Sequence, residues 1–291
     1  MDIEKQIRWA NGLRNTDDGK VYFTPKNKPN VRKKEMTIMT RHGNVTVFVY
    51  EPVQESNNIF INLHGGGFVA GSASVDDCWC ELIAESAGCV VYNVEYSLSP
   101  EHKFPRAIEE IYDVALHIKD SGNKIAIGGH SAGGNLATAV CLYNINTGGK
   151  IPFIYQILDY PLLDLHTKAS EKPKYKEAIP IDIADKFNIC YLDSLKEAKN
   201  PLASPLFSED LGKMPQALII TAELDSLVKE GFQYAVRLMQ AGVTVTYKEY
   251  KGMVHAFNYN GGDYDTAMHS WELMAIGLKG AFNTVISTLV G

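Results

Sequence analysis

The sequence predicts an α/β fold in which helices flank a mostly parallel central sheet. Short β-rich runs alternate with longer helical patterns along the chain, and this alternation is typical of a doubly wound sheet. Runs such as residues 59–63 are almost continuously apolar, as expected for parallel strands that helices cover on both faces. A chain of 291 residues is long enough for one large domain, so we assign residues 1–291 to a single domain.

The same patterns place the individual elements. The expected strands are residues 45–50, 59–63, 89–96, 124–127, 154–158, 217–221 and 244–250. The expected helices are residues 78–87, 105–120, 132–144, 229–241 and 264–286. The helix at 105–120 begins with Pro105, which is favoured in a first helical turn, and its Ile108, Ile111 and Ala115 lie near helical spacing on one face.

Residues 165–200 interrupt this alternation. The segment is rich in charged side chains, and a helical pattern through Ile183, Phe187 and Leu192 follows Pro180. Because the segment falls between two expected core strands, we interpret it as a small helical cap inserted at the edge of the sheet. A solvated loop is the alternative interpretation.

Composition and charge narrow the function classes. The chain has 28 basic and 34 acidic residues and a net charge of −6, so a nucleic-acid partner is not expected. It contains no apolar run of about 18 residues, so no membrane span is expected, and its charged start lacks the apolar region of a signal peptide. Its five cysteines include Cys78 and Cys80, which lack the spacing of a zinc or redox pair. We therefore expect reduced thiols in a cytoplasmic protein.

A single serine lies within a glycine-rich turn. Residues 128–134 read G-G-H-S-A-G-G, between an expected strand and the expected helix at 132–144. Glycines permit a strand-to-helix turn so tight that larger side chains would clash. The hydroxyl of Ser131 would then stand at a helix N-terminus, where free N–H groups favour developing negative charge. A nucleophilic serine is therefore predicted. A plain turn is the alternative, and a phosphate-binding loop is disfavoured because the Walker A Lys is absent.

A serine hydroxyl needs a base before it can attack an ester. Binding and catalytic residues of α/β proteins gather in loops at the carboxyl ends of strands. His255 lies in such a loop, directly after the expected strand at 244–250. By contrast, His166 falls in the predicted cap and His269 falls within a helical pattern. His255 is therefore the candidate base, and a structural histidine is the alternative.

The base in turn needs a carboxylate that orients it. Asp225 follows the expected strand at 217–221 and is the candidate acid. Glu223 lies two residues earlier and competes with it, and Asp159, after another strand, is a further competitor. For each of them the alternative is a carboxylate that satisfies a turn.

A second glycine-rich turn follows the strand at 59–63. It reads His64-Gly65-Gly66-Gly67-Phe68. Glycines let backbone N–H groups approach a substrate oxygen closely, which an oxyanion hole requires. A further donor is expected from the backbone N–H of Ala132, the residue after the nucleophile. Two such turns, each after an apolar strand, favour a catalytic arrangement over a flexible turn.

Taken together, these segments resemble the hormone-sensitive-lipase-like family of α/β-hydrolases, the bacterial carboxylesterases with an H-G-G-G-[FW] loop. The resemblance spans residues 58–260, roughly. Residues 129–137 resemble the G-D-S-A-G-G-N-L-A motif of the family, and residues 96–105 resemble its Y-R-L-A-P-E-x-x-F-P segment. The pair Tyr160-Pro161 and residues 252–257 fit as well.

The resemblance implies an α/β-hydrolase fold and a serine carboxylesterase that hydrolyses short-acyl esters, acetyl to butyryl, through an acyl-enzyme. The implied roles are nucleophile for Ser131, base for His255, acid for Asp225, and oxyanion donors for Gly66, Gly67 and Ala132. The aromatic residues Phe68 and Tyr160 are candidate substrate contacts, with a place in the core as the alternative. The expected partner is a small-molecule ester, with no metal or cofactor. By resemblance to this family, a homodimer is also expected.

Three departures from the family pattern modify this expectation. His130 stands where the family has Asp, and G-H-S-A-G also occurs in kynurenine-formamidase-like hydrolases, so a formamidase or amidase is the alternative. The acid motif D-P-L-x-D-E appears here as D-S-L-V-K-E, which keeps Asp225. The N-terminal arm is short, so residues 1–40 are expected to help build only a small cap over an open pocket.

A binding protein without catalytic activity is the remaining alternative. Plant gibberellin receptors have this fold but lack the catalytic histidine. Here all three triad candidates are present, so an enzyme is favoured, although a fold alone does not fix a function.

Overall fold

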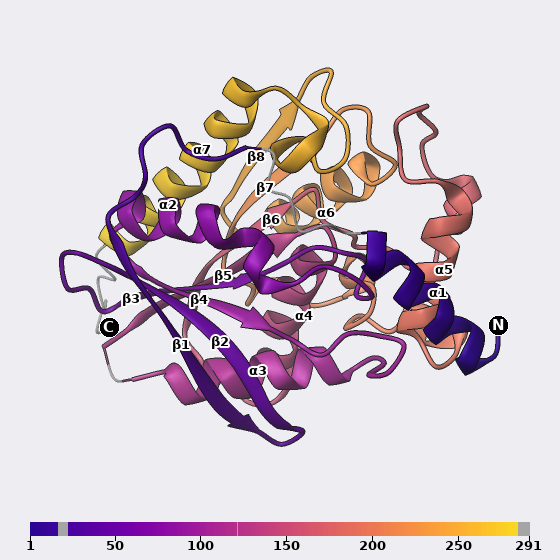
Figure 1. The fold of residues 1–291 in the computed structure, drawn as a ribbon, viewed down its shortest axis with the longest axis horizontal. Coiled ribbons are helices and arrows are strands. Elements are labelled where there is room, and N and C mark those ends of the chain that lie inside the picture. Colours follow the sequence, from indigo (N-terminus) through magenta and orange to yellow (C-terminus); the bar gives the residue numbers. More distant parts are fainter. Residues whose placement is uncertain (17–22, 121, 285–291) are drawn as a thin grey trace.

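A computed structural model describes residues 1–16, 23–120 and 122–284 of the chain (Figure 1). Its strands are β1 (Val31–Thr40), β2 (Gly43–Pro52), β3 (Asn58–Leu63), β4 (Val90–Glu95), β5 (Lys124–His130), β6 (Phe153–Asp159), β7 (Gln216–Ala222) and β8 (Val245–Tyr250). Its helices are α1 (Ile3–Thr16), α2 (Asp77–Ala87), α3 (Arg106–Ile118), α4 (Ala132–Asn146), α5 (Ile181–Tyr191), α6 (Val228–Gln240) and α7 (Tyr264–Asn283). Shorter helical turns are η1 (Ala73–Asp76), η2 (Ala169–Glu171), η3 (Leu195–Lys199), η4 (Pro205–Phe207) and η5 (Phe257–Gly261).

The strands form one sheet in the order β1-β2-β4-β3-β5-β6-β7-β8. From β4 to β8 every neighbouring pair is parallel, whereas β1 pairs with β2 and β2 pairs with β4 in the antiparallel sense. This confirms the predicted mostly parallel sheet. Because the parallel strands all point the same way, the loops after β3, β5, β7 and β8 meet at one edge of the sheet.

Helices cover both faces of the sheet. Successive side chains of a strand point to opposite faces, so Ile61 of β3 packs in one core with Leu136 of α4, whereas Phe60 packs in the other core with Trp79 of α2. Figure 1 shows α2 and α7 on one side of the sheet and α3 on the other. Burial on both faces explains the continuous apolar runs of the central strands.

All the expected strands and helices are present to within a few residues, except that positions 285 and 286 of the last expected helix lie outside the described residues. Two further elements, α1 and β1, are absent from the sequence-based expectation. β1 is an edge strand paired on one side only, and most of its side chains are exposed, including Lys33 and Lys34. Charged side chains are common on edge strands because they oppose pairing with other chains. They also replace the alternation of apolar and polar residues by which a strand is recognised in a sequence.

The segment from residue 165 to residue 200, which we call the cap segment, contains η2, α5 and η3. Its helix α5 lies beside α1 at one end of the molecule (Figure 1), and the rings of Trp9 and Phe187 meet edge to face with their centroids 5.6 Å apart. We continue to interpret this segment as a cap, with α1 as its N-terminal support. In the part of the chain that the structure describes, every helix is too short or too polar to cross a membrane.

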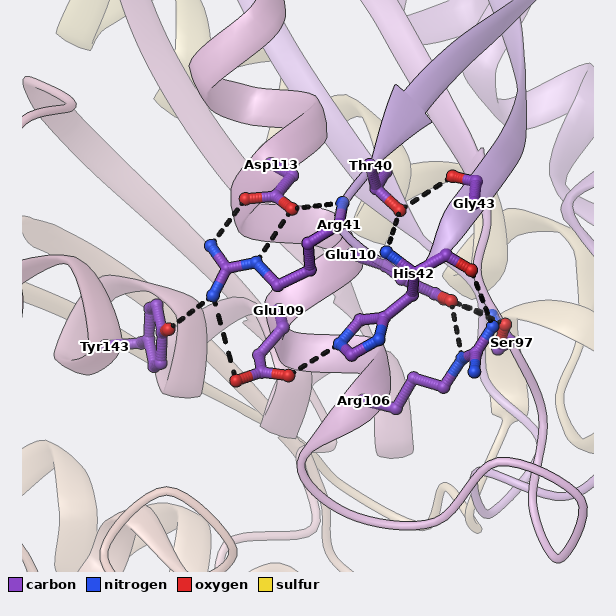
Figure 2. Close-up of polar contacts among 10 residues, drawn as sticks. All are labelled: Thr40, Arg41, His42, Gly43, Ser97, Arg106, Glu109, Glu110, Asp113 and Tyr143. Atoms are coloured by element: carbon purple, nitrogen blue, oxygen red, sulfur yellow. Dashed lines mark hydrogen bonds and ion pairs between the residues drawn. The ribbon is translucent and has the colours of Figure 1, made fainter.

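The turn between β1 and β2 is fastened to α3 by a polar cluster (Figure 2). Arg41 donates to Asp113 from its backbone N–H and from its guanidinium, and it also donates to the hydroxyl of Tyr143. His42 lies 2.6 Å from a carboxylate oxygen of Glu109. Burial alone would raise the pKa of Asp113, but the hydrogen bonds from Arg41 hold it below its ordinary value. The cluster therefore fixes the edge hairpin to the helical layer.

Replacing Arg41 with Met is expected to lower the free energy of unfolding by about 1 kcal/mol at pH 7, because the side chain is partly exposed and its network is screened by water. The loss should shrink as the pH falls through the depressed pKa of Asp113, since protonation removes the carboxylate that Arg41 binds. Urea unfolding at pH 7 and pH 3 measures both effects. The matched control is Arg32→Met, whose exposed pair with Glu51 should contribute less. An equal loss in both variants would contradict the assignment.

Candidate active site

Ser131 occupies a strained turn between β5 and α4. Its φ of 53° and ψ of −113° lie in a region that side-chain-bearing residues seldom adopt, at a cost of about 1–3 kcal/mol. Its backbone N–H donates to the carbonyl of Asp159 at 2.9 Å, and its own carbonyl accepts from the N–H groups of Asn135 and Leu162. These bonds hold the turn in place and leave the hydroxyl to other partners.

Glycines on both sides of this turn let α4 approach β3. A Cβ at Gly133 would lie 2.0 Å from the carbonyl oxygen of Leu63, and a Cβ at Gly129 would lie 2.3 Å from the same oxygen. Real side chains cannot come so close to backbone. The glycines predicted from the turn motif are therefore required by packing of the first turn of α4 on the end of β3.

Three side chains from the carboxyl edge of the sheet form a hydrogen-bonded chain. Nε2 of His255 lies 3.0 Å from Oγ of Ser131, and Nδ1 of His255 lies 2.7 Å from Oδ2 of Asp225. His255 follows β8 and Asp225 follows β7, as the sequence predicts. Asp225 is fully buried, and its other oxygen accepts the backbone N–H of Leu227. This is the geometry of a nucleophile, a base and an orienting acid.

The competing residues lie elsewhere. Glu223 is half-exposed and pairs with Lys251, and Asp159 binds His130. His166 is exposed in the cap segment. His269 lies in α7, and its Nδ1 is hydrogen-bonded to the hydroxyl of Tyr250 at the end of β8. Of the sequence-based candidates for base and acid, only the side chains of His255 and Asp225 connect to the hydroxyl of Ser131, directly or through one another.

The environment of His255 adjusts its basicity. Burial of the ring alone would lower its pKa, but the charge and hydrogen bond of Asp225 outweigh this effect, and the pKa of His255 lies above its ordinary value. A raised pKa makes the imidazole a stronger acceptor for the proton of a serine hydroxyl. The edge of the Tyr160 ring faces the imidazole, with centroids 4.9 Å apart.

The loop after β3 presents free backbone donors. Gly66 and Gly67 have φ values of 123° and 62°, and a Cβ at Gly67 would lie 2.5 Å from the ring of Phe187 in α5. Nowhere in residues 1–16, 23–120 or 122–284 do the backbone N–H groups of Gly66, Gly67 and Ala132 find an acceptor. His64 stacks on Tyr96 and thereby braces the loop, with ring centroids 4.2 Å apart. The loop can thus offer N–H groups to an oxyanion.

A cavity of about 760 Å³ opens onto these groups. Its lining includes Ser131, His255, Gly66, Gly67 and Tyr160 together with much of the cap segment. Cavities of this size are typical of small-molecule sites.

Phe68 does not line this cavity, contrary to its expected role as a substrate contact. Its ring is 1% exposed and stacks on Tyr191 with centroids 3.7 Å apart. The physical reason is the left-handed backbone at Phe68, with a φ of 66°, in a turn that carries the ring into the core. Tyr160, the other predicted contact, does line the cavity.

Comparison with known proteins agrees with this geometry. Residues 60–259 match a family described as alpha/beta hydrolase fold. The chain belongs to the α/β-hydrolase family. An arylesterase of Saccharolobus solfataricus is 32% identical over 233 residues, which cover 77% of this chain and 76% of that protein. An acetyl esterase of Salmonella schwarzengrund is 30% identical over 243 residues, which cover 79% of this chain and 74% of that protein.

Solved structures of other α/β-hydrolases share the whole architecture. A hyperthermophilic esterase from Pyrobaculum calidifontis has a TM-score of 0.79 and 31% identity, covering 98% of this chain and 95% of that one. The carboxylesterase EstE1 from a metagenomic library has a TM-score of 0.82 and 28% identity, covering 98% of this chain and 99% of that one. The predicted fold and family are confirmed.

This α/β-hydrolase also contains a buried polar bridge that the sequence analysis did not predict. Nδ1 of His130 lies 2.9 Å from Oδ2 of Asp159, which also accepts from the amide of Asn258 at 2.7 Å. Asn258 in turn accepts from the hydroxyl of Tyr160. The bridge joins the residue before the nucleophile to the end of β6 and to the loop that carries His255. The one available signal was His130 itself, which stands where the related motif has Asp.

Two neighbouring carboxylates raise the pKa of His130 in this α/β-hydrolase. Burial alone would lower the pKa of His130, but its hydrogen bond to Asp159 and the charges of Asp76 and Asp159 raise this pKa above its ordinary value. Nε2 of His130 lies 3.9 Å from the nearer carboxylate oxygen of Asp76. His130 thus lies between the buried carboxylates of Asp159 and Asp76.

Replacing His130 with Gln is expected to lower the free energy of unfolding by about 3 kcal/mol at pH 6, because it leaves buried Asp159 without its cationic partner. The pKa of His130 is higher in the folded than in the unfolded protein. Its stabilisation of the fold is therefore complete below the unfolded-state pKa of about 6.5, and it is lost as the pH rises through the folded-state pKa. The difference between the proteins should therefore shrink by pH 9. His255 titrates in both proteins and cancels.

Denaturant unfolding at pH 6 and pH 9 measures this difference. The matched control is His117→Gln, since His117 is exposed on α3 and its loss should change little at either pH. A loss of stability that is the same at both pH values would show that His130 acts by packing and not by charge.

Proposed function

We propose that this protein is a serine carboxylesterase that hydrolyses short-acyl esters, acetyl to butyryl, through an acyl-enzyme. At the level of reaction class it is a carboxylic ester hydrolase, since it has the α/β-hydrolase fold and its relatives and structural neighbours are esterases by name. The observation that carries the mechanism is the contact of His255 with both Ser131 and Asp225, at 3.0 and 2.7 Å. The natural setting we propose is the cytoplasm.

The proposed reaction proceeds by acyl transfer. His255 takes the proton of Ser131 as the serine oxygen attacks the ester carbonyl, and Asp225 stabilises the imidazolium that forms. The N–H groups of Gly66, Gly67 and Ala132 would hold the oxyanion. Protonated His255 then gives its proton to the departing alcohol, and an acyl-enzyme remains. Water, activated by His255, repeats the attack and releases the acid.

The proposed preference for short acyl groups is supported by the name of one relative. The Salmonella relative is an acetyl esterase by name. A formamidase remains the second candidate because His130 adjoins the nucleophile in a G-H-S-A-G segment, and the same triad can attack a formyl amide.

Replacing Ser131 with Ala is expected to lower kcat on 4-nitrophenyl acetate by about 10⁴-fold or more, because no other hydroxyl among the described residues is hydrogen-bonded to His255. The measurement is a chain-length series of 4-nitrophenyl esters from acetate to decanoate, with a peak expected between acetate and butyrate. Exposed Ser170→Ala is the control and should retain full activity. Near-complete activity in the Ser131 variant would refute the mechanism, and faster turnover of N-formylkynurenine than of aryl acetate would favour the formamidase.

Replacing Asp225 with Asn is expected to lower kcat by about 10⁴-fold, since the imidazole loses both its orientation and its counter-charge. The acidic limb of the pH profile should also move to lower pH, because the Asp225 carboxylate raises the pKa of His255. The profile of kcat/KM between pH 5 and pH 9 measures both changes. Glu223→Gln is the matched control, because Glu223 is the nearest competing carboxylate in the sequence and binds Lys251 instead. A larger loss in the Glu223 variant would reverse the assignment.

A further inference from the structure

The wall that the cap segment contributes to the cavity is rich in lysine. Lys172, Lys174 and Lys176 all line the cavity, at alternate positions of the segment before α5. The chain as a whole is acidic, with a net charge of −6. A run of three cations facing one cavity is therefore opposite in sign to the average surface and produces a local positive potential.

Lys172 is already committed to neighbouring groups. Its ammonium lies 2.6 Å from a carboxylate oxygen of buried Glu230 and 2.7 Å from the carbonyl oxygen of Asp164. Glu230 in turn accepts the backbone N–H of Leu163. This pair fastens the start of the cap segment to α6, and Lys172 is thereby engaged in a structural contact.

Lys174 and Lys176 have no such partner. Both are exposed, and across the described ranges neither makes a hydrogen bond or an ion pair. The acidic residues of the same stretch, Glu171 and Glu177, do not line the cavity. Two lysines without a polar partner therefore form part of the wall of the space that a substrate enters.

Little negative charge opposes these two lysines inside the cavity. Asp76 is the one carboxylate among the described lining residues. It is fully buried, and its oxygens accept hydrogen bonds from Asn62 and from the hydroxyl of Tyr259. Among the described lining residues, the lysines of the cap wall thus outnumber the single carboxylate.

We propose that the ester this enzyme is built to hydrolyse carries a negatively charged group, a carboxylate being the simplest, which Lys174 and Lys176 bind while the ester carbonyl lies at Ser131. The inference rests on the proposed esterase function and adds the charge of its substrate. A carboxylate at hydrogen-bond distance from two partly solvated ammonium groups gains enough Coulomb energy for about a five- to tenfold preference over a neutral analogue. Added salt should weaken this preference, because exposed charges are screened.

Two matched pairs of probes test this on the purified protein. The first pair places the charge on the acyl side, as 4-nitrophenyl hemisuccinate against 4-nitrophenyl pentanoate. The second pair places it on the alcohol side, as 4-acetoxybenzoate against 4-acetoxybenzamide. The quantity measured is the ratio of kcat/KM for the charged and the neutral ester. Comparing this ratio between variants cancels the intrinsic reactivity of each ester.

The test variant is Lys174→Gln with Lys176→Gln, and the control is Lys168→Gln with Lys199→Gln. The control removes the same charge from exposed positions of the same cap segment that do not line the cavity. In at least one probe pair, the test variant should lower the ratio about five- to tenfold, with the neutral ester unaffected. The control should keep the wild-type ratio. In that pair, 0.5 M NaCl should lower the wild-type ratio toward that of the test variant.

An unchanged ratio in both pairs would overturn the inference and leave the esterase function standing. An equal fall in the test and control variants would also overturn it, because the effect would then come from net charge and not from the cavity wall. If no ester of either pair is hydrolysed by folded wild-type protein, the proposed function fails and the inference fails with it.

Discussion

The close approach of the first turn of α4 to the end of β3 is the constraint on which the rest of the site depends. Glycine at positions 129 and 133 allows this approach, because the carbonyl of Leu63 occupies the space that a Cβ would need. The approach brings the nucleophile beside the glycine loop that follows β3. Parallel strand order then adds the loops after β7 and β8 at the same edge of the sheet. Residues distant in sequence, such as Ser131 and His255, thus meet at one edge of the sheet.

Elements with a strong local signal were predictable from the sequence. Central strands such as β3 and β5 are buried on both faces, so their apolar runs are visible, and glycine-rich turns after them reveal the catalytic edge. The choice of Asp225 over Glu223 depended on which carboxylate faces the imidazole, and only the fold decides this. β1 was missed because its exposed, charged side chains carry no burial pattern.

Other features lacked a sequence signal because they depend on backbone direction or on contacts between distant segments. Phe68 belongs to a motif that adjoins the catalytic edge, yet its positive φ sends the ring away from the cavity and onto Tyr191. The bridge from His130 through Asp159 to Asn258 joins the ends of β5 and β6 to the helical turn η5. A single unusual residue in a motif can mark such a bridge, but it does not reveal the partners.

Phe187 connects the cap to the catalytic edge through a single ring. One side of this ring lies against Gly67 where a Cβ would otherwise be, and it also meets Trp9 of the N-terminal helix. Positions along the cap segment therefore differ in how freely they can be substituted. Changes at Lys174 or Lys176 can alter substrate choice one charge at a time, because these side chains have no structural partner. A larger or smaller side chain in place of Phe187 would disturb the packing at both the N-terminal helix and the glycine loop. It would therefore require compensating substitutions in two other parts of the chain.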